Sequence, residues 1–231
     1  SQMRAKYCIA SGGYIGFYAL GQSHIDSDYS IAVANASDGV YCANNSSINA
    51  SYGLSCLNGG YGYAAVDSST LRLTTQGSVR GDSNTTLYPP NITADVRYGQ
   101  SDKSGAFAFR NSMAGVYAEN SIIYADNSRT SYNMRAGYYI NQHSSMDGAY
   151  SNSWYNGFAH TNERTQSGYS ISDNSSVEVS NCRSMWNAHN GLYASHRSYI
   201  NHGTFSGTSG GTVDNNQRNA FKAKYDSTIL L

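Results

Sequence analysis

The sequence predicts an all-β fold, a parallel β-helix (β-solenoid) with about 23 residues per coil and three short strands per coil. The first observation is a recurring Gly-apolar-Tyr-Ala motif, which appears as GFYA at Gly16, GVYC at Gly39 and GYAA at Gly62, each 23 residues after the last. The second is a poor supply of Leu, Glu and Lys beside abundant Gly, Ser, Asn and Tyr, which disfavours helices. Later copies of the motif start at Gly115, Gly137, Gly157 and Gly191.

The third observation is a set of apolar columns counted from each motif glycine. Alternate residues of a strand share a face, so positions +1 and +3, such as Phe17 and Ala19, are expected to point inward. Positions +9 and +17 are apolar in most copies and predict two further inward columns, hence two further strands. The +9 column holds Ile25, Ile48, Leu71, Tyr124, Met146, Val177 and Ile200, and the +17 column holds Val33, Cys56, Val79, Tyr132, Trp154 and Met185.

The irregular spacings place the domain boundaries. Residues 1–13 are expected to be a lead-in or cap, 14–210 the β-helix, and 211–231 a last coil or cap. The long interval between Gly62 and Gly115 predicts one divergent coil and an insert near 73–104. The interval between Gly157 and Gly191 predicts a second insert, near 160–171.

Composition excludes several classes of function. Lys+Arg and Asp+Glu are both 15, so the formal net charge is zero, and nucleic-acid binding through released counterions is not expected. No apolar run approaches the roughly 20 residues that a membrane span needs, so no membrane insertion is predicted. Nothing in the sequence predicts a cofactor.

Cysteine and histidine spacing argues against a metal site. The four cysteines, at 8, 42, 56 and 182, match no metal-binding spacing and are expected to be buried thiols in a reducing compartment, with two disulfides as the alternative. His189, His196 and His202 would lie on different faces of one coil, so we predict no zinc site.

A serine column at +7 is expected to be structural. A hydroxyl at a corner of the coil can satisfy backbone groups, and no Gly-x-Ser-x-Gly nucleophile motif is present. The column comprises Ser23, Ser46, Ser69, Ser144, Ser175 and Ser198.

The coils GVYCANNSSINASYGLSCLNGGYGYAA and GYYINQHSSMDGAYSNSWYNGFAH resemble the repeated coils of bacteriophage tail fibres and tailspikes. The resemblance covers roughly residues 14–205. It implies a right-handed parallel β-helix, a homotrimer, and recognition of bacterial surface glycans, sometimes with cleavage. The chain departs from the cleaving members in being short, with eight or nine coils. The location implied is the virion tail, after folding in the host cytoplasm.

Position +2 of the motif points outward and is repeatedly tyrosine. A long aromatic stripe on one outer face is expected to be covered in an oligomer, which makes a trimer interface the favoured interpretation and a glycan platform the alternative. The residues concerned are Tyr18, Tyr41, Tyr117, Tyr139 and Tyr193.

Tyr155 and Trp186 each follow a +17 residue and are expected to point outward, one coil apart. With Asn156 and Asn187 beside them they form a candidate glycan-binding site, and packing on a partner chain is the alternative.

Cleavage of a glycan would need two carboxyl groups roughly 5–9.5 Å apart. Asp147 and Glu178 fall in one outward column in successive coils and so could meet. The inserts add Asp82, Asp95 and Glu163 as weaker candidates.

We therefore expect a receptor-binding domain that recognises a bacterial surface polysaccharide such as capsule, lipopolysaccharide O-antigen or exopolysaccharide. A polysaccharide depolymerase, either a glycoside hydrolase or a lyase, is one alternative, and a structural fibre shaft or bacterial surface adhesin is another.

Overall fold

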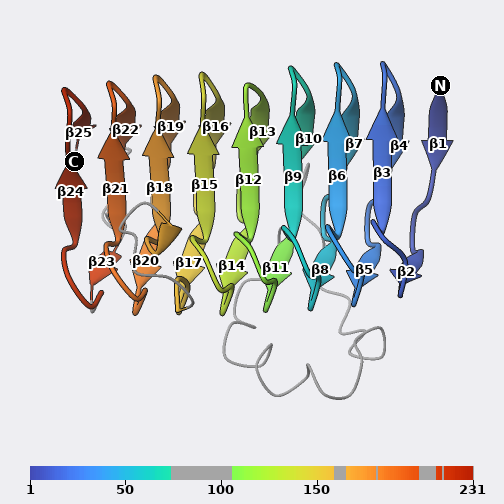
Figure 1. The fold of residues 1–231 in the computed structure, drawn as a ribbon, viewed down its shortest axis with the longest axis horizontal. Helices are drawn as coiled ribbons and strands as arrows, with labels where there is room; N and C mark the ends of the chain where they lie inside the picture. Colours follow the sequence, from blue (N-terminus) through green and yellow to red (C-terminus); the bar gives the residue numbers. More distant parts are fainter. Residues whose placement is uncertain (74–105, 159–164, 181, 203–211, 215, 231) are drawn as a thin grey trace.

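The computed structural model describes residues 1–73, 106–158, 165–180, 182–202, 212–214 and 216–230. Its strands form three parallel sheets, which we call A, B and C, and the chain visits them in turn on every coil (Figure 1). Partners in sheet A are 23 residues apart, as His24, Ser47 and Thr70 show. The fold is a right-handed parallel β-helix, as the sequence predicts. The described residues include no helix long and apolar enough to cross a membrane.

Sheet A has nine strands among the described residues, and the middle residues of those from β4 to β22 point into the core. The strands are β1 (Gln2–Arg4), β4 (His24–Asp26), β7 (Ser47–Asn49), β10 (Thr70–Arg72), β13 (Ile122–Tyr124), β16 (Ser145–Asp147), β19 (Ser176–Glu178), β22 (Tyr199–Asn201) and β25 (Thr228–Leu230).

Sheet B has eight strands, each three residues long. They are β2 (Ile9–Ser11), β5 (Ile31–Val33), β8 (Leu54–Cys56), β11 (Phe107–Phe109), β14 (Arg129–Ser131), β17 (Asn152–Trp154), β20 (Arg183–Met185) and β23 (Thr212–Asp214).

Sheet C has eight strands, which carry the motif residues. They are β3 (Phe17–Leu20), β6 (Val40–Ala43), β9 (Tyr63–Val66), β12 (Val116–Glu119), β15 (Tyr138–Asn141), β18 (Tyr169–Ser172), β21 (Leu192–Ser195) and β24 (Phe221–Ala223).

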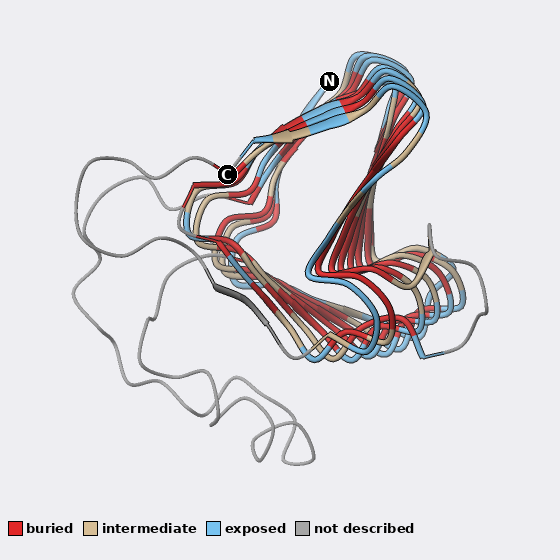
Figure 2. Ribbon diagram, turned by 90° about the vertical axis from the view of Figure 1, so that its left-hand side faces the viewer, coloured by how far each residue is buried: buried red, intermediate tan, exposed pale blue. Residues whose placement is uncertain are grey.

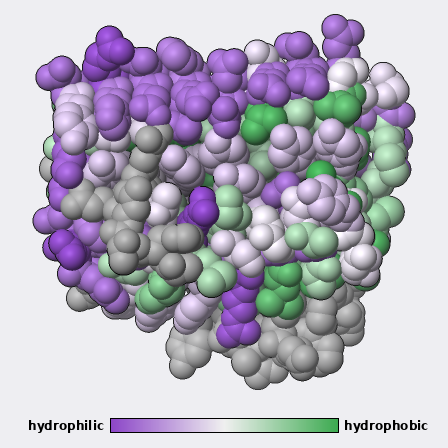
Figure 3. Space-filling model, viewed as in Figure 1, coloured by the Kyte–Doolittle hydropathy of each residue, from purple (hydrophilic) through white to green (hydrophobic). Residues whose placement is uncertain are grey.

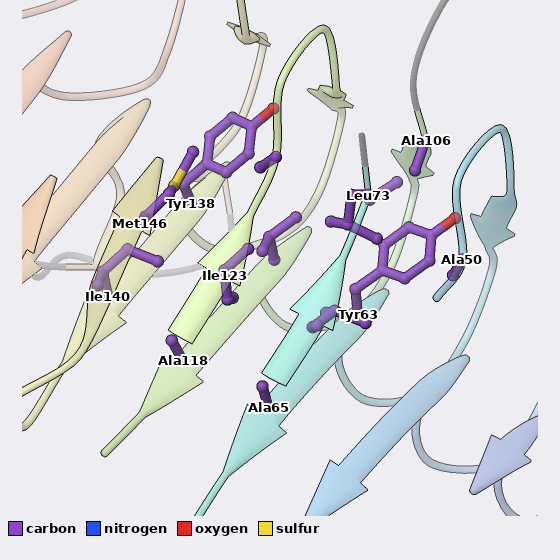
Figure 4. Close-up of a cluster of buried hydrophobic side chains, with 14 of the residues drawn as sticks. Ala50, Tyr63, Ala65, Leu73, Ala106, Ala118, Ile123, Tyr138, Ile140 and Met146 are labelled. Carbon is purple, nitrogen blue, oxygen red and sulfur yellow. The ribbon is translucent and has the colours of Figure 1, made fainter. Parts of the chain in front are cut away.

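The core lies between the three sheets, as the end-on view shows (Figure 2). The predicted inward positions +1 and +3 of sheet C are buried in every strand from β3 to β21, while Phe221 and Ala223 of the last strand, β24, are exposed. They pack on the middle residues of sheet A, and Figure 4 shows Tyr138 and Ile140 with Met146, and Tyr63 near Leu73. The +1 and +3 columns are therefore confirmed.

The +9 column is confirmed except at Tyr124. Ile123 is the fully buried residue, in register with Leu71, while Tyr124 points outward. Most turns that lead from sheet C to sheet A (C–A turns) contain two residues with positive φ, such as Asn44 and Asn45. The C–A turn between β12 and β13 contains only one, Asn120. One residue fewer in the turn moves the whole strand by one position and exchanges its faces.

The +17 column was assigned to the wrong face. The middle residues of sheet B, such as Ser55, point inward, and the Ser55 hydroxyl donates to the Gly62 carbonyl at 2.6 Å. A Cβ added to Gly39 would lie 1.9 Å from Ser55 Oγ. This close approach leaves no room for a side chain at position 39, so the motif requires glycine. Cys56 and Trp154 therefore lie on the outer face of sheet B, and Ser131 replaces Tyr132 in that column. Val79 lies outside the described residues.

The inserts also differ from expectation. The strand of the sixth motif begins at Tyr169 after Gly168, in register with β15 and β21, so the second insert ends before Gly168 and not at 171. Gly157 is not the motif glycine, and Phe158 is exposed. β10 pairs directly with β13, so no extra coil separates them. Residues 74–105, almost all of the first predicted insert, lie outside the described part of the chain.

The chain ends contribute strands. The predicted lead-in 1–13 contains β1 and β2, which pair with β4 and β5. The last segment contains β23, β24 and β25, which extend all three sheets.

Candidate functional site

An aromatic ladder runs along the turns that lead from sheet B to sheet C (B–C turns) in three successive coils. Tyr132, Tyr155 and Trp186 each follow a sheet B strand, with φ of 54°, 50° and 53°. The centroid distance is 5.1 Å between Tyr132 and Tyr155 and 5.2 Å between Tyr155 and Trp186, with interplanar angles of 12° and 10°. Tyr132 is 40 % exposed, Trp186 is 39 % exposed and Tyr155 is half-buried. The predicted outward pairing of Tyr155 and Trp186 is confirmed, and Tyr132 extends it.

Asn156 and Asn187 do not belong to this surface. Both are fully buried, and Asn156 Nδ2 donates to Asn187 Oδ1 at 3.2 Å. They are part of an internal asparagine ladder in which each side chain bonds the next coil, so their place in the glycan site is wrong. The ladder comprises Asn35, Asn58, Asn111, Asn133, Asn156, Asn187 and Asn216.

The outer face of sheet B adjoins the aromatic ladder. Arg129, Asn152 and Arg183 are register partners at the first positions of β14, β17 and β20. Trp154, expected in the core, lies half-buried on this outer face, and its buried indole nitrogen has no hydrogen-bond partner among the described residues. The surface is therefore mixed, with cationic, amide and aromatic side chains.

The outward tyrosines of sheet C do not form one exposed stripe. Tyr18 is 48 % exposed and Tyr41 and Tyr139 are half-buried, but Tyr117 and Tyr193 are buried. Ala64 and Ser170 interrupt the column in register. Tyr61 stacks on Tyr117 at 4.4 Å, and the Tyr117 hydroxyl donates to Glu119, so part of the stripe is covered by the chain itself.

Figure 3 shows the resulting face of sheet C. Hydrophilic side chains gather along the edge where sheet C turns into sheet A, and apolar or weakly polar ones lie over its N-terminal half. Tyr18 and Leu20 of β3 are the large exposed side chains there, and Tyr41, Tyr61, Val66 and Ala43 belong to a cluster beside them.

The predicted carboxylate pair is adjacent. Asp147 and Glu178 are register partners on β16 and β19, both exposed, and neighbouring strands lie about 4.8 Å apart. Asp126, missed by the sequence analysis, lies beside them: burial first, and then the charge of Asp147, raises the pKa of its carboxyl group. Asp126 also has a structural role, because its Oδ1 accepts the Ala149 backbone N–H at 2.9 Å. Asp82, Asp95 and Glu163 lie outside the described residues.

The serine column is structural, as predicted. The hydroxyls of Ser69, Ser144, Ser175 and Ser198 accept a backbone N–H from the preceding coil, for example Ser69 from Ser46 at 3.3 Å and Ser175 from Ser144 at 3.2 Å. The hydroxyls of Ser23 and Ser46 donate to the carbonyls of Leu20 and Ala43. Ser121, which the shortened turn concealed in the sequence, joins the same column.

The cysteines and histidines have separate environments. Cys42, Cys56 and Cys182 are buried, and burial raises the pKa of each thiol to about 12, whereas Cys8 is exposed and the expectation of four buried thiols is wrong there. His189 and His202 are buried, and His196 Nδ1 lies 3.5 Å from Asp173 Oδ1. In the described part of the chain, no three His, Cys, Asp or Glu side chains gather to hold a metal ion.

A second aromatic ladder, also missed, lies on the A–B turns of the first coils. Tyr29 stacks between Tyr7 at 5.0 Å and Tyr52 at 4.6 Å. The signal available in the sequence was tyrosine recurring at residues 7, 29 and 52, a period of 22 to 23 residues.

Among solved structures, the chain is similar to one titled crystal structure of pectate lyase Pel9A. The TM-score is 0.46 and the identity 11 %, over 90 % of this chain and 53 % of that chain. This chain thus spans about half the length of the other. The similarity is one of fold, the parallel β-helix. No family model and no curated protein matches the chain.

Proposed function

We propose that the chain is a receptor-binding β-helix of a phage tail fibre or tailspike, which binds a bacterial surface polysaccharide through the aromatic ladder Tyr132–Tyr155–Trp186. The observation that carries the proposal is the exposure of these rings in one row on a rigid support. Met134 and Phe158, in the same B–C turns, are also exposed, so large uncharged side chains concentrate here. Such concentrations on a soluble surface typically mark binding sites. The phage assignment rests on the resemblance of the coils.

Binding is tested with purified capsule or O-antigen polysaccharides by calorimetry. Trp186→Ala should weaken binding about tenfold, which corresponds to about 1.4 kcal/mol. The matched control is Tyr150→Ala, because Tyr150 is 57 % exposed and has the same positive φ (56°) but lies on an A–B turn. Equal affinities of the two variants, or no binding of any polysaccharide by the parent chain, would contradict the proposal.

We also propose a homotrimer, with the outer face of sheet C as the contact. Tyr18 and Leu20 supply exposed apolar area there, and closed cyclic symmetry would cover it in every copy. Light scattering should then give a mass near three chains of 25.0 kDa, and Tyr18→Asp with Leu20→Asp should lower it. A parent chain that remains monomeric at micromolar concentration would reject this contact.

One observation favours a second function, cleavage of the polysaccharide. Asp147 and Glu178 are at adjacent register positions, near the separation of about 5–5.5 Å used by retaining glycosidases. In such a pair one carboxyl group would be the nucleophile and the other the acid. New reducing ends on incubation with bound polysaccharide, lost in Asp147→Asn, would establish cleavage, and their absence would leave binding alone.

A further inference from the structure

Stacking of the aromatic ladder determines which parts of the rings a ligand can touch. With interplanar angles of 12° and 10°, Tyr155 has one face against Tyr132 and the other against Trp186. Both faces of its ring are therefore occupied within the chain. A sugar cannot stack on Tyr155 and must meet the outward ring edges instead.

Ring edges differ from ring faces in charge. The aromatic quadrupole makes the face negative and the edge positive, so rings that stack on one another present their positive rims to solvent. Two polar groups at these rims, the Tyr155 hydroxyl and the Trp186 indole N–H, have no hydrogen bond to a residue that the structure describes. The indole N–H is a donor only, and the phenol O–H is available as a donor. This row of edges therefore suits a ligand rich in acceptor oxygens.

The adjoining outer face of sheet B adds a cation. Arg183 is exposed at the start of β20, and Trp186 follows the end of the same strand, about 10 Å away. The outward positions of β14, β17 and β20, together with the aromatic ladder, contain two arginines and no carboxylate. Arg129 is engaged within the chain, so Arg183 is the cation that we consider for a ligand. The nine positions are Arg129, Ser131, Tyr132, Asn152, Trp154, Tyr155, Arg183, Met185 and Trp186.

Two described acidic residues of the same coils lie on another face. Asp147 and Glu178 occupy the outer face of sheet A, on β16 and β19. The outward positions of β14, β17 and β20 contain Arg129 and Arg183 without a carboxylate, and the nearest acidic register position is Asp214 on β23, so the surplus of positive charge is local to these three strands. A local surplus of positive charge beside the indole and phenol donors favours anions.

We propose that the polysaccharide bound by the aromatic ladder is anionic, and that Arg183 and the outward edges of Tyr155 and Trp186 contact its charged groups. The inference rests on the proposed function and specifies its ligand class. The shared chemistry is a sugar bearing carboxylate, sulfate or phosphate groups, in a chain that lies along the helix axis on the strip between Arg183 and the aromatic ladder.

The test compares three polymers with the same chain by calorimetry: polygalacturonate for carboxylate, dextran sulfate for sulfate, and neutral dextran. At least one anionic polymer should bind more than tenfold tighter than dextran, and the arm that binds identifies the charged group. Arg183→Gln should weaken that binding about tenfold, as expected for loss of a charge-assisted contact of about 1.5 kcal/mol. The matched control is Arg197→Gln, because Arg197 is an exposed arginine on a C–A turn.

Two readouts separate the possible failures. If Arg183→Gln and Arg197→Gln weaken binding equally, the attraction is general electrostatics and the assignment of Arg183 is overturned. If dextran binds as well as the anionic polymers, and Trp186→Ala still weakens binding, the anionic preference is wrong while the proposed function stands. If Trp186→Ala has no effect on any polymer or bacterial polysaccharide, the proposed function fails as well. Unchanged melting temperatures show that the variants remain folded.

Discussion

Replacing Asn133 by Ala tests whether the internal asparagine ladder stabilises the coils. Asn133 is fully buried. Its Nδ2 donates to the Ala108 carbonyl at 3.2 Å and to Asn156 Oδ1 at 3.0 Å. Its Oδ1 accepts the Asn111 backbone N–H at 3.0 Å and Asn111 Nδ2 at 2.9 Å. The substitution removes all four hydrogen bonds, across both neighbouring coils.

The expected loss follows from these contacts. The Asn111 backbone N–H loses its partner inside the protein, which costs about 1–3 kcal/mol, and the other three bonds contribute about 0.5–1.5 kcal/mol each. Asn133→Ala should therefore lower the free energy of unfolding by about 2.5–7.5 kcal/mol, a large share of the about 5–15 kcal/mol typical of a domain. The control is Asn152→Ala, because Asn152 lies on the outer face and makes one exposed hydrogen bond, to the Tyr150 carbonyl.

Equilibrium unfolding in urea, followed by the fluorescence of Trp154 and Trp186, measures both variants. Asn152→Ala should cost less than about 0.5 kcal/mol, as surface substitutions usually do. If Asn133→Ala came within 1 kcal/mol of the control, water or backbone shifts would satisfy the freed groups, and the asparagine ladder would not stabilise the coils in the way argued.

Three further predictions concern single buried or exposed groups. Ile48→Asp places an unpaired carboxylate at a site that is 1 % exposed and should lower the free energy of unfolding by several kcal/mol. A melting temperature within a degree or two of the parent would refute the inward assignment of Ile48. A thiol-reactive dye should label one cysteine in the native chain, Cys8, and four after denaturation without reductant; fewer than four would indicate disulfides. Burial lowers the pKa of His202, so the folded state binds fewer protons and stability should fall as the pH drops below about 6.5. In His202→Leu, which copies Leu73 at the equivalent position, the melting temperature should lose this part of its pH dependence; an unchanged dependence would exclude His202 as its source.

The coil could be predicted because stacking imposes one period on every column. Ile25, Ile48 and Leu71 must superpose to fill the same space, and the motif glycines must recur because sheet B approaches them closely. The serine column follows from the same repetition. One shortened turn, in which only Asn120 has positive φ, was enough to misplace Tyr124, because the sequence does not show at which position of the coil a residue is missing.

The face of sheet B could not be predicted, because its strands are too short. In strands such as Leu-Ser-Cys and Phe-Ala-Phe, the first and third residues are apolar and the middle residue is small. This pattern is compatible with either face of the strand pointing inward. Only the approach of Gly39 to Ser55 decides that the small residue faces inward. The same ambiguity placed Trp154 in the core and left Asn156 and Asn187 on the surface, although asparagine recurs at that position from Asn35 onward.

Stacked rings alone do not identify a binding site in this protein, because the core contains the same geometry. Tyr138 and Tyr169 stack at 4.6 Å with an interplanar angle of 8°, yet both are buried and their hydroxyls are paired with Ser128 at 2.9 Å and Ser151 at 2.8 Å. Tyr155 and Trp186 share the stacking but have solvent at their edges, and their side-chain donors have no hydrogen-bond partner within the described chain. The hydroxyls of the buried Tyr138–Tyr169 pair are already hydrogen-bonded within the chain, whereas Tyr155 and Trp186 have unused donors near an exposed arginine. The aromatic ladder on the surface is therefore the one suited to an external ligand.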